Sequence, residues 1–242
     1  MSDALVFRVN PALNSQHYAD IFRRDGIVQI NDLFEPPLAD HLAAVLKENT
    51  YWRLNYSDEK GGAVALDGKD LAKLDTTRLW EEIIQRARTG FSYVYLVCYL
   101  PGIYGLPEQA EHPLHKLVKF LNSSAFLDFG REITGEAGVD RVDAAATWYR
   151  PGDFLNLHSD EVGLRRVAYT LGFTRGWRAD WGGQLLFHDK SGEIIRGLMP
   201  GFNVLTLFKI PRLHSVAQVT LYATEPRLMI SGWLLEGQAH PA

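Results

Sequence analysis

The sequence predicts an α+β fold in which helices pack against a β-sandwich or barrel. Its 242 residues suit one domain of that kind, although length alone would also allow two small ones. Apolar residues recur with helical spacing in the first 142 residues, and short β-rich runs bounded by Gly, Pro and Asp follow. No Pro- or Ser-rich linker separates the halves. We therefore predict a single domain over residues 1–242, with mainly helical support plus flanking strands in 1–142 and a β-rich core in 143–242.

The first part of the chain carries start and stop signals for helices. Asn14 or Ser15 is suited to cap a first helix, and Asp25-Gly26 to end it. The polar, glycine-bearing segment from Asp58 to Gly68 predicts a mobile loop, which could act as a lid. Helices are expected at residues 15–24, from Pro36-Pro37 onward, at 70–88, 113–121 and 124–133, with a short strand at 27–30.

The second part contains a series of short β-rich runs. Their regular spacing and the turn residues between them are typical of a sandwich or barrel. Paired glycines at Gly182-Gly183 indicate positive φ or a close approach of the backbone to a neighbour, and a plain hairpin turn is the alternative. Strands are expected at residues 144–150, 167–173, 184–188, 203–208, 215–219 and 227–234.

The composition excludes several classes of protein. Hydrophobic residues make up 46% and charged residues 22% of the chain, as in ordinary globular proteins. The longest strand-like apolar run, Phe91 to Leu100, falls short of the ~20 residues that a membrane helix needs, so no membrane association is expected. The net charge of −4 offers no basic excess for nucleic acid. The single cysteine, Cys98, and the lack of a secretory signal predict a cytoplasmic protein with a buried, inert thiol.

The most informative segment ends in His158-Ser-Asp160. On a strand, residues spaced i, i+2 leave the same face, so this imidazole and carboxylate could bind one metal ion. A third ligand must come from elsewhere, and His214 is the leading candidate, with His188 as the weaker alternative. Two histidines and one carboxylate leave three positions of an octahedral ion open, as in non-haem Fe(II) oxygenases. A His-x-Asp pair by itself is more often structural.

Arg227 begins an alternating strand on which Met229, Ser231 and Trp233 share its face. An interior arginine needs a partner, because an unpaired buried charge is very costly. Its planar guanidinium matches a carboxylate bidentately. Arg227 is therefore a candidate clamp for a dicarboxylate, and a surface arginine at the start of a strand is the alternative.

The order of these residues resembles the 2-oxoglutarate- and Fe(II)-dependent oxygenases, and within them the prolyl-4-hydroxylase-like branch. The resemblance covers roughly residues 144–235 and includes Trp181-Gly-Gly-Gln-Leu185, Pro211, His214-Ser215 and Ser231-Gly-Trp233. It implies that the strands form a double-stranded β-helix (jelly roll) supported by N-terminal helices. It also implies that residues 1–242 are one oxygenase domain, with the metal site in 143–242.

The resemblance further implies the roles of individual residues. Fe(II) would be held by His158, Asp160 and His214. Arg227 would bind the 5-carboxylate of the co-substrate 2-oxoglutarate, assisted by Tyr149 and Ser231. Arg227 lies slightly farther from His214 than is usual in the family, and Ser231 lies four residues beyond Arg227 rather than two. The implied cofactors are Fe(II), 2-oxoglutarate and O₂, with ascorbate left open.

The activity implied by the resemblance is hydroxylation of a protein or peptide, at a prolyl residue, with release of succinate and CO₂. The retained carboxylate of Asp160 favours hydroxylation over halogenation. Three alternatives stay open: the same chemistry on a free amino acid or other small metabolite, a non-catalytic sensor of metal or 2-oxoglutarate, and a zinc hydrolase, for which no general base is evident. The sequence does not indicate an oligomeric state.

Two groups of residues bear on the substrate. Five arginines near the motif could attract an acidic peptide or another anion, or could form an ordinary solvated basic face. Five aromatic residues could line a substrate cleft or could pack in the core. The arginines are Arg150, Arg165, Arg166, Arg175 and Arg178, and the aromatic residues are Trp52, Tyr56, Tyr95, Tyr99 and Trp177.

Overall fold

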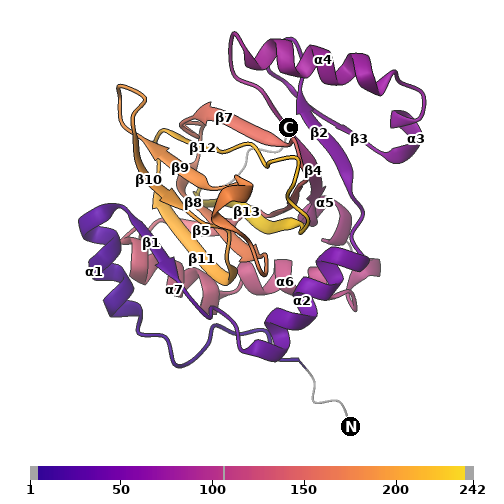
Figure 1. The fold of residues 1–242 in the computed structure, drawn as a ribbon. Coiled ribbons are helices and arrows are strands. Elements are labelled where there is room, and N and C mark those ends of the chain that lie inside the picture. Colours follow the sequence, from indigo (N-terminus) through magenta and orange to yellow (C-terminus); the bar gives the residue numbers. More distant parts are fainter. Residues whose placement is uncertain (1–4, 106, 238–242) are drawn as a thin grey trace.

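A computed structural model describes residues 5–105 and 107–237. Within these ranges thirteen strands form one curled sheet, with helices against its outer side (Figure 1). The helices are α1 (Ser15–Asp25), α2 (Pro36–Glu48), α3 (Gly68–Leu71), α4 (Thr76–Ala87), α5 (Leu100–Tyr104), α6 (Pro113–Leu121) and α7 (Ser124–Thr134). The strands are β1 (Ile27–Ile30), β2 (Arg53–Ser57), β3 (Ala63–Leu66), β4 (Tyr93–Tyr99), β5 (Val139–Val142), β6 (Ala145–Tyr149), β7 (Phe154–His158), β8 (Arg165–Phe173), β9 (Leu185–His188), β10 (Ile194–Leu198), β11 (Phe202–Lys209), β12 (His214–Val216) and β13 (Arg227–Glu236).

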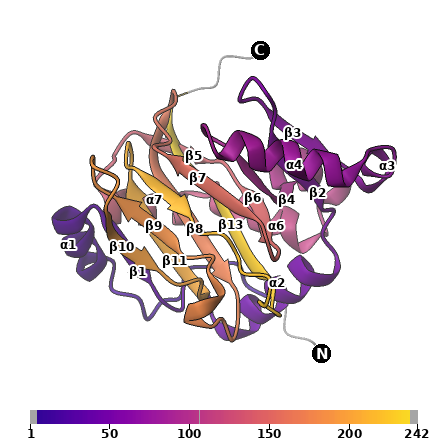
Figure 2. The ribbon, with the colours of Figure 1, turned by 45° about the horizontal axis from the view of Figure 1, so that its top comes forward.

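Hydrogen bonds join the strands in the order β1-β11-β8-β13-β6-β4-β7-β12-β9-β10. Strands β2 and β3 extend from β4, and β5 pairs with β13. The sheet curls so that β7, β12, β9 and β10 lie over β13, β8 and β11, as Figures 1 and 2 show. This arrangement confirms the predicted double-stranded β-helix with supporting helices.

The helices cover the outer face of the long strands. Helices α1, α2, α6 and α7 lie together along one side of the sheet (Figure 1). Their apolar residues form the main core with alternate residues of β8 and β13, among them Leu171 and Ile230. Because side chains alternate along a strand, the intervening residues of β8 and β13 face the interior of the β-helix. Within the described residues, no helix is both long enough and apolar enough to span a bilayer.

The segment from Asp58 to Gly68, predicted as a mobile loop, contains a strand in the structure. Ala63–Leu66 forms strand β3, which pairs with β2 through Leu54 and Leu66. The turn between the strands is closed by the carboxylate of Asp58, which accepts hydrogen bonds from the backbone N–H groups of Lys60 and Gly62. Local polarity therefore marks only the turn, while the partner strand orders the rest of the segment.

The helix predicted over 70–88 is divided in the structure. Helix α3 ends at Leu71, and α4 begins at Thr76. The carboxylate of Asp75 accepts hydrogen bonds from the backbone N–H groups of Thr77 and Arg78, which makes Asp75 the N-cap of a new helix. The capping residue Asp75 therefore divides a segment whose apolar pattern by itself predicts one continuous helix.

The buried side chain of Asn203 ties the sheet to the N-terminal segment. Its amide oxygen accepts a hydrogen bond from the backbone N–H of Phe34 at 3.0 Å, and its amide nitrogen donates to the carbonyl of Phe34 at 2.7 Å. Asn203 itself has a φ of +57°, a left-handed conformation that Asn tolerates better than most residues.

Replacing Asn203 by Ala is expected to lower the free energy of unfolding by about 2–4 kcal/mol, because two buried backbone groups of Phe34 lose their partner. Chemical denaturation followed by circular dichroism measures the effect. Asn49→Ala, at an exposed helix end, is the control and should change stability by less than about 0.5 kcal/mol. Equal stability of the two variants would contradict this role of Asn203.

Candidate metal centre and its cavity

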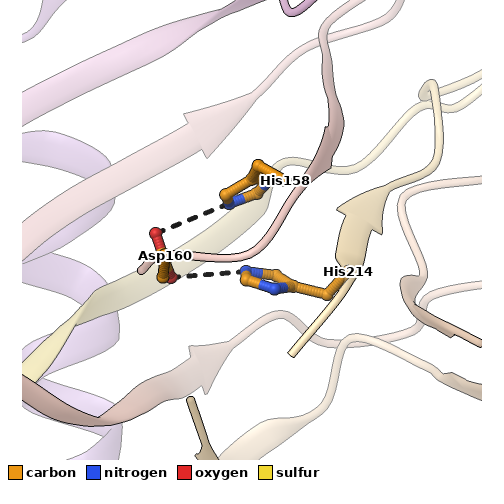
Figure 3. A group of neighbouring side chains, drawn as sticks. All are labelled: His158, Asp160 and His214. Atoms are coloured by element: carbon orange, nitrogen blue, oxygen red, sulfur yellow. Dashed lines mark ion pairs between the residues drawn. The ribbon is translucent and has the colours of Figure 1, made fainter. Parts of the chain in front are cut away.

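Three side chains capable of binding a metal meet at one end of the β-helix (Figure 3). His158 ends β7 and His214 begins β12, and the antiparallel register pairs the two residues directly. Asp160 lies between their rings: its carboxylate oxygens are 3.7 Å from His158 Nε2 and 3.4 Å from His214 Nε2. One donor atom from each residue lies within 4.8 Å of the others, a separation that a shared metal ion can bridge.

The position of Asp160 differs from the predicted strand geometry. Strand β7 ends at His158, and Asp160 lies in the following turn with a φ of +58°. The prediction that the two side chains leave one face of a strand is therefore wrong. It is the left-handed turn that brings the carboxylate to the imidazoles. Left-handed backbone at a residue other than glycine is uncommon and is concentrated at functional sites.

A bulge in β7 directs His158 inward. Between the pairs His214–His158 and Val216–Leu155, β12 advances by two residues and β7 by three. This extra residue places Leu155 and His158 on the same cavity despite their odd spacing. Bulges are a common means of re-aiming a side chain next to a site.

Each histidine is held in the tautomer that suits metal binding. The Nδ1–H of His158 donates to the carbonyl of Asn156 at 2.8 Å, and that of His214 donates to the carbonyl of Arg212 at 2.7 Å. Because a carbonyl only accepts, both Nδ1 atoms carry the proton and both Nε2 lone pairs are free on the side of Asp160. Burial lowers the pKa of His158 to about 4, with a further contribution from His214, and so favours the neutral, ligating form.

The carboxylate of Asp160 is itself positioned by two side chains. The indole Nε1–H of Trp233 donates to Oδ2 at 2.9 Å, and the guanidinium of Arg165 is 3.4 Å from Oδ1. Arg165 also stacks on the Trp233 ring, 3.4 Å from its centroid. Burial acts to raise the pKa of Asp160, but the contacts with His214, His158 and Trp233 outweigh it, and the pKa is lowered. The carboxylate is therefore kept ionised, as a metal ligand must be.

Arg227 lies in the same cavity as the three candidate metal ligands. Only 3% of its surface is exposed, and no carboxylate of the described residues lies within 4 Å of its guanidinium. Its Nε–H donates to the carbonyl of Gly183 at 2.6 Å, and its guanidinium carbon is 4.6 Å from the centre of the Tyr149 ring. Burial lowers the pKa of Arg227 to about 10, although the residue stays charged at neutral pH. A buried cation without a protein anion fits a site for an anionic ligand.

The paired glycines hold Arg227 in place. Gly182 and Gly183 have φ values of +71° and +68°, which side chains rarely adopt. A Cβ on Gly182 would lie 2.0 Å from the carbonyl oxygen of Gln218, and one on Gly183 would lie 3.0 Å from Cδ of Arg227. Both positive φ and close approach are confirmed. The sequence did not reveal that the carbonyl of Gly183 anchors Arg227.

The other expected site residues also line this cavity. Tyr149 is 4% exposed and stacks on Tyr95 with 4.8 Å between ring centres, and burial raises the pKa of Tyr149. Ser231 lies on β13 opposite Thr170 of β8, a hydroxyl that the sequence analysis missed although its strand was predicted. The lining comprises Tyr95, Thr147, Tyr149, Leu155, His158, Asp160, Ala168, Tyr169, Thr170, Leu185, Phe208, His214, Val216, Arg227, Met229, Ser231, Gly232 and Trp233.

His188, the alternative third ligand, lies outside the centre. Its Nε2 is hydrogen-bonded to the hydroxyl of Ser215 at 2.9 Å, and its Nδ1 to the carbonyl of Gly192 at 3.1 Å. The cluster of donor atoms includes His214 instead. The geometry therefore favours His214.

The five arginines near the motif are all paired with acids, so they present little free positive charge to a substrate. Four of these pairs are Arg150–Asp153, Arg165–Asp160, Arg166–Glu236 and Arg178–Asp180, and Arg175 pairs with Asp40. Of the five aromatic residues, Tyr95 lines the cavity.

The structure combines a double-stranded β-helix with two histidines, a carboxylate and a buried arginine in one cavity, a set of groups that suits a non-haem Fe(II) oxygenase. The comparison of the sequence with known families agrees: residues 144–235 match the model of the 2OG-Fe(II) oxygenase superfamily. These residues include all three metal-binding side chains and Arg227. This part of the chain is therefore similar in sequence to the 2OG-Fe(II) oxygenase superfamily.

Two curated relatives are similar in sequence. The chain is 31% identical over 126 residues to "Prolyl 3-hydroxylase OGFOD1" of Mus musculus, which covers 48% of this chain and 23% of the relative. It is 30% identical over 126 residues to the protein of the same name in Xenopus laevis, covering 48% and 24%. The matched region therefore spans about a quarter of these relatives.

Solved structures show the same fold. A prolyl-4-hydroxylase of Pseudomonas putida superposes with a TM-score of 0.58 at 17% identity, covering 97% of this chain and 100% of that one. A prolyl hydroxylase of Trichoplax adhaerens, solved with a peptide fragment of a hypoxia inducible factor, gives 0.58 at 15% identity, covering 91% and 89%. At these identities the likeness concerns the fold alone.

Trp233→Phe tests the support of the carboxylate. The variant keeps an aromatic ring for Arg165 but loses the hydrogen bond to Asp160, so the affinity for Fe(II) or Mn(II) is expected to fall about 10–100-fold. Trp52→Phe is the matched control, because the buried indole N–H of Trp52 has no hydrogen-bond partner. Anaerobic metal titration measures both, and equal affinities would contradict a positioning role for Trp233.

Proposed function

We propose that the protein is an Fe(II)- and 2-oxoglutarate-dependent dioxygenase that hydroxylates a prolyl residue of a protein or peptide and releases succinate and CO₂. The observation that carries the proposal is that one cavity contains the candidate metal ligands His158, Asp160 and His214 together with the buried Arg227, for which the described part of the chain offers no acidic partner. The two features together match a metal and a dicarboxylate, whereas either alone would allow other functions.

The residues at the two ends of the cavity would have different roles. His158, Asp160 and His214 would hold Fe(II), which with 2-oxoglutarate and O₂ supplies the oxidising chemistry. Arg227 would bind the far carboxylate of 2-oxoglutarate, and its fixed position at Gly183 would orient that molecule. The buried walls of the cavity keep water away from the bound carboxylate and so strengthen this interaction.

Support for a prolyl substrate comes from the relatives, whose printed names are prolyl hydroxylases. The pairing of the five motif arginines with acids leaves little basis for an anionic substrate. Hydroxylation of a free amino acid would use the same metal and co-substrate residues, so it differs only in what the outer part of the cavity binds.

Anaerobic addition of Fe(II) and 2-oxoglutarate to the metal-free protein tests the proposed centre. A weak visible charge-transfer absorption is expected, and the addition of O₂ should then yield succinate. His214→Ala should lose both, because it removes a ligand, whereas His188→Ala should keep both, because His188 lies outside the cluster. A folded wild type without the absorption would overturn the proposed function, and its survival in His214→Ala would overturn the ligand assignment.

Arg227→Met tests the clamp. The affinity for 2-oxoglutarate should fall about 100-fold or more, because a buried charge pair can no longer form. At a concentration of 100 times Kd, 2-oxoglutarate should stabilise the metal-loaded wild type by about 2.7 kcal/mol and the variant hardly at all. Thermal unfolding with Mn(II) and 2-oxoglutarate measures both effects.

The metal-free form of Arg227→Met should keep its stability. Burial lowers the pKa of Arg227 below its ordinary value to about 10, so the positive charge opposes folding; this cost is complete below about pH 10 and is lost only as the pH rises toward the ordinary pKa of arginine. Removing the charge therefore relieves a cost at neutral pH. Arg23→Met, at an exposed position, serves as the control. An unchanged 2-oxoglutarate affinity in Arg227→Met would exclude the clamp.

A further inference from the structure

A row of aromatic rings leads from His158 to the cavity wall, where its last two members, Tyr95 and Tyr149, line the cavity. It consists of Phe91, Tyr93 and Tyr95, which follow each other at spacings of two before and along β4, and of Tyr149 on β6. The ring centres are 5.6 Å apart between Phe91 and Tyr93, 5.5 Å between Tyr93 and Tyr95, and 4.8 Å between Tyr95 and Tyr149. We call these four residues the aromatic row. Of the β4 residues in this row, only Tyr95 was expected from the sequence as a candidate to line a substrate cleft.

Exposure changes from one end of the aromatic row to the other. Phe91 is 44% exposed, while Tyr93 and Tyr149 are 7% and 4% exposed. The exposed end lies at the metal centre, since the Phe91 ring is 5.6 Å from the His158 ring. The buried end lies at Arg227, over which Tyr149 stacks. An exposed aromatic ring therefore lies beside His158, whereas the Arg227 end of the row is buried.

The chemistry of the exposed end favours an uncharged, compact, apolar group. Phe91 and Tyr93 offer ring faces and no charge, and the neighbouring imidazole of His158 is directed at Asp160. A free amino acid would need partners for its ammonium and carboxylate groups, which these two rings do not supply. The saturated ring of a prolyl residue packs well against aromatic faces, and its stiffness limits the entropy lost on binding.

We propose that Phe91 and Tyr93 form the substrate subsite, in which the ring of the target prolyl residue packs against the exposed face of Phe91 next to His158. This inference rests on the proposed function and adds to it the residues that select the substrate. The peptide on either side of the prolyl residue is uncharged where it meets the two rings. Phe91 is on this basis a specificity-determining residue, in contact with substrate and not with the metal.

The test compares three probes: the blocked peptide Gly-Ala-Pro-Ala-Gly, the same peptide with Ala in place of Pro, and free L-proline. The protein is loaded with Mn(II) and 2-oxoglutarate without O₂, so that binding is measured without turnover. Isothermal titration calorimetry gives the affinities. Broadening of the proline ring protons by paramagnetic Mn(II) reports whether the ring lies near the metal. The wild type should prefer the prolyl peptide about tenfold over the alanyl peptide and over free proline.

Phe91→Ala should abolish this preference and weaken binding of the prolyl peptide about tenfold, and Phe91→Leu, which keeps apolar volume without a ring face, should do the same. Phe91→Tyr should restore the preference. Tyr51→Ala is the matched control, because Tyr51 is an aromatic residue of similar exposure, 49%, whose hydroxyl hydrogen-bonds to Asp67, whereas Phe91 packs beside His158.

The outcomes separate the subsite from the proposed function. If the wild type shows the charge-transfer absorption but no preference for the prolyl peptide, the subsite proposal is wrong and the oxygenase proposal stands. The same holds if Phe91→Ala binds the prolyl peptide as the wild type does. Tighter binding of free L-proline than of the peptide would also overturn it, in favour of a small amino acid. A folded wild type without the absorption would instead overturn the proposed function, and the subsite proposal with it.

Discussion

The pairing of β7 with β12 is the constraint on which the site depends. Their antiparallel register sets His158 opposite His214, and two imidazoles on neighbouring strands can then share one ion. A shift of one residue would turn one of the rings to the other face of the sheet, since side chains alternate. The register is interrupted by the bulge in β7, which allows both His158 and Leu155 to face the same cavity.

The third ligand depends on a different kind of structure. Asp160 follows the strand in a left-handed turn, and such a turn is easily distorted unless its side chain is held. Trp233 and Arg165 hold it from β13 and from the start of β8. The long strands therefore stabilise a turn that local sequence would leave free. This explains how a carboxylate outside regular structure can keep the precision that a metal site requires.

Much of this could be predicted from the sequence, for reasons that particular residues make clear. The alternation of β13 was sufficient to place Arg227, Ser231 and Trp233 on one inward face, because period two allows only two faces. What could not be predicted depends on distant partners. Strand β3 exists because β2 lies beside it, and the division of the helix near Asp75 depends on competition between capping and continuation. The role of Gly183 as an acceptor for Arg227 depends on the fold, which brings together two residues 44 positions apart.

Strand β13 joins the two halves of the site into one mechanical unit. Arg227 at its start faces the closed end of the cavity, and Trp233, six residues on, supports Asp160 at the metal. At about 3.4 Å per residue, six residues span roughly 20 Å along the strand. The position of Arg227 relative to Trp233 is therefore set by one continuous segment of backbone. Strand β13 is paired on both sides, with β6 and with β8, and its outward residues are packed under the helices. The helical layer does not line the cavity, but it packs against the strand that connects Arg227 with the support of the candidate metal ligand Asp160.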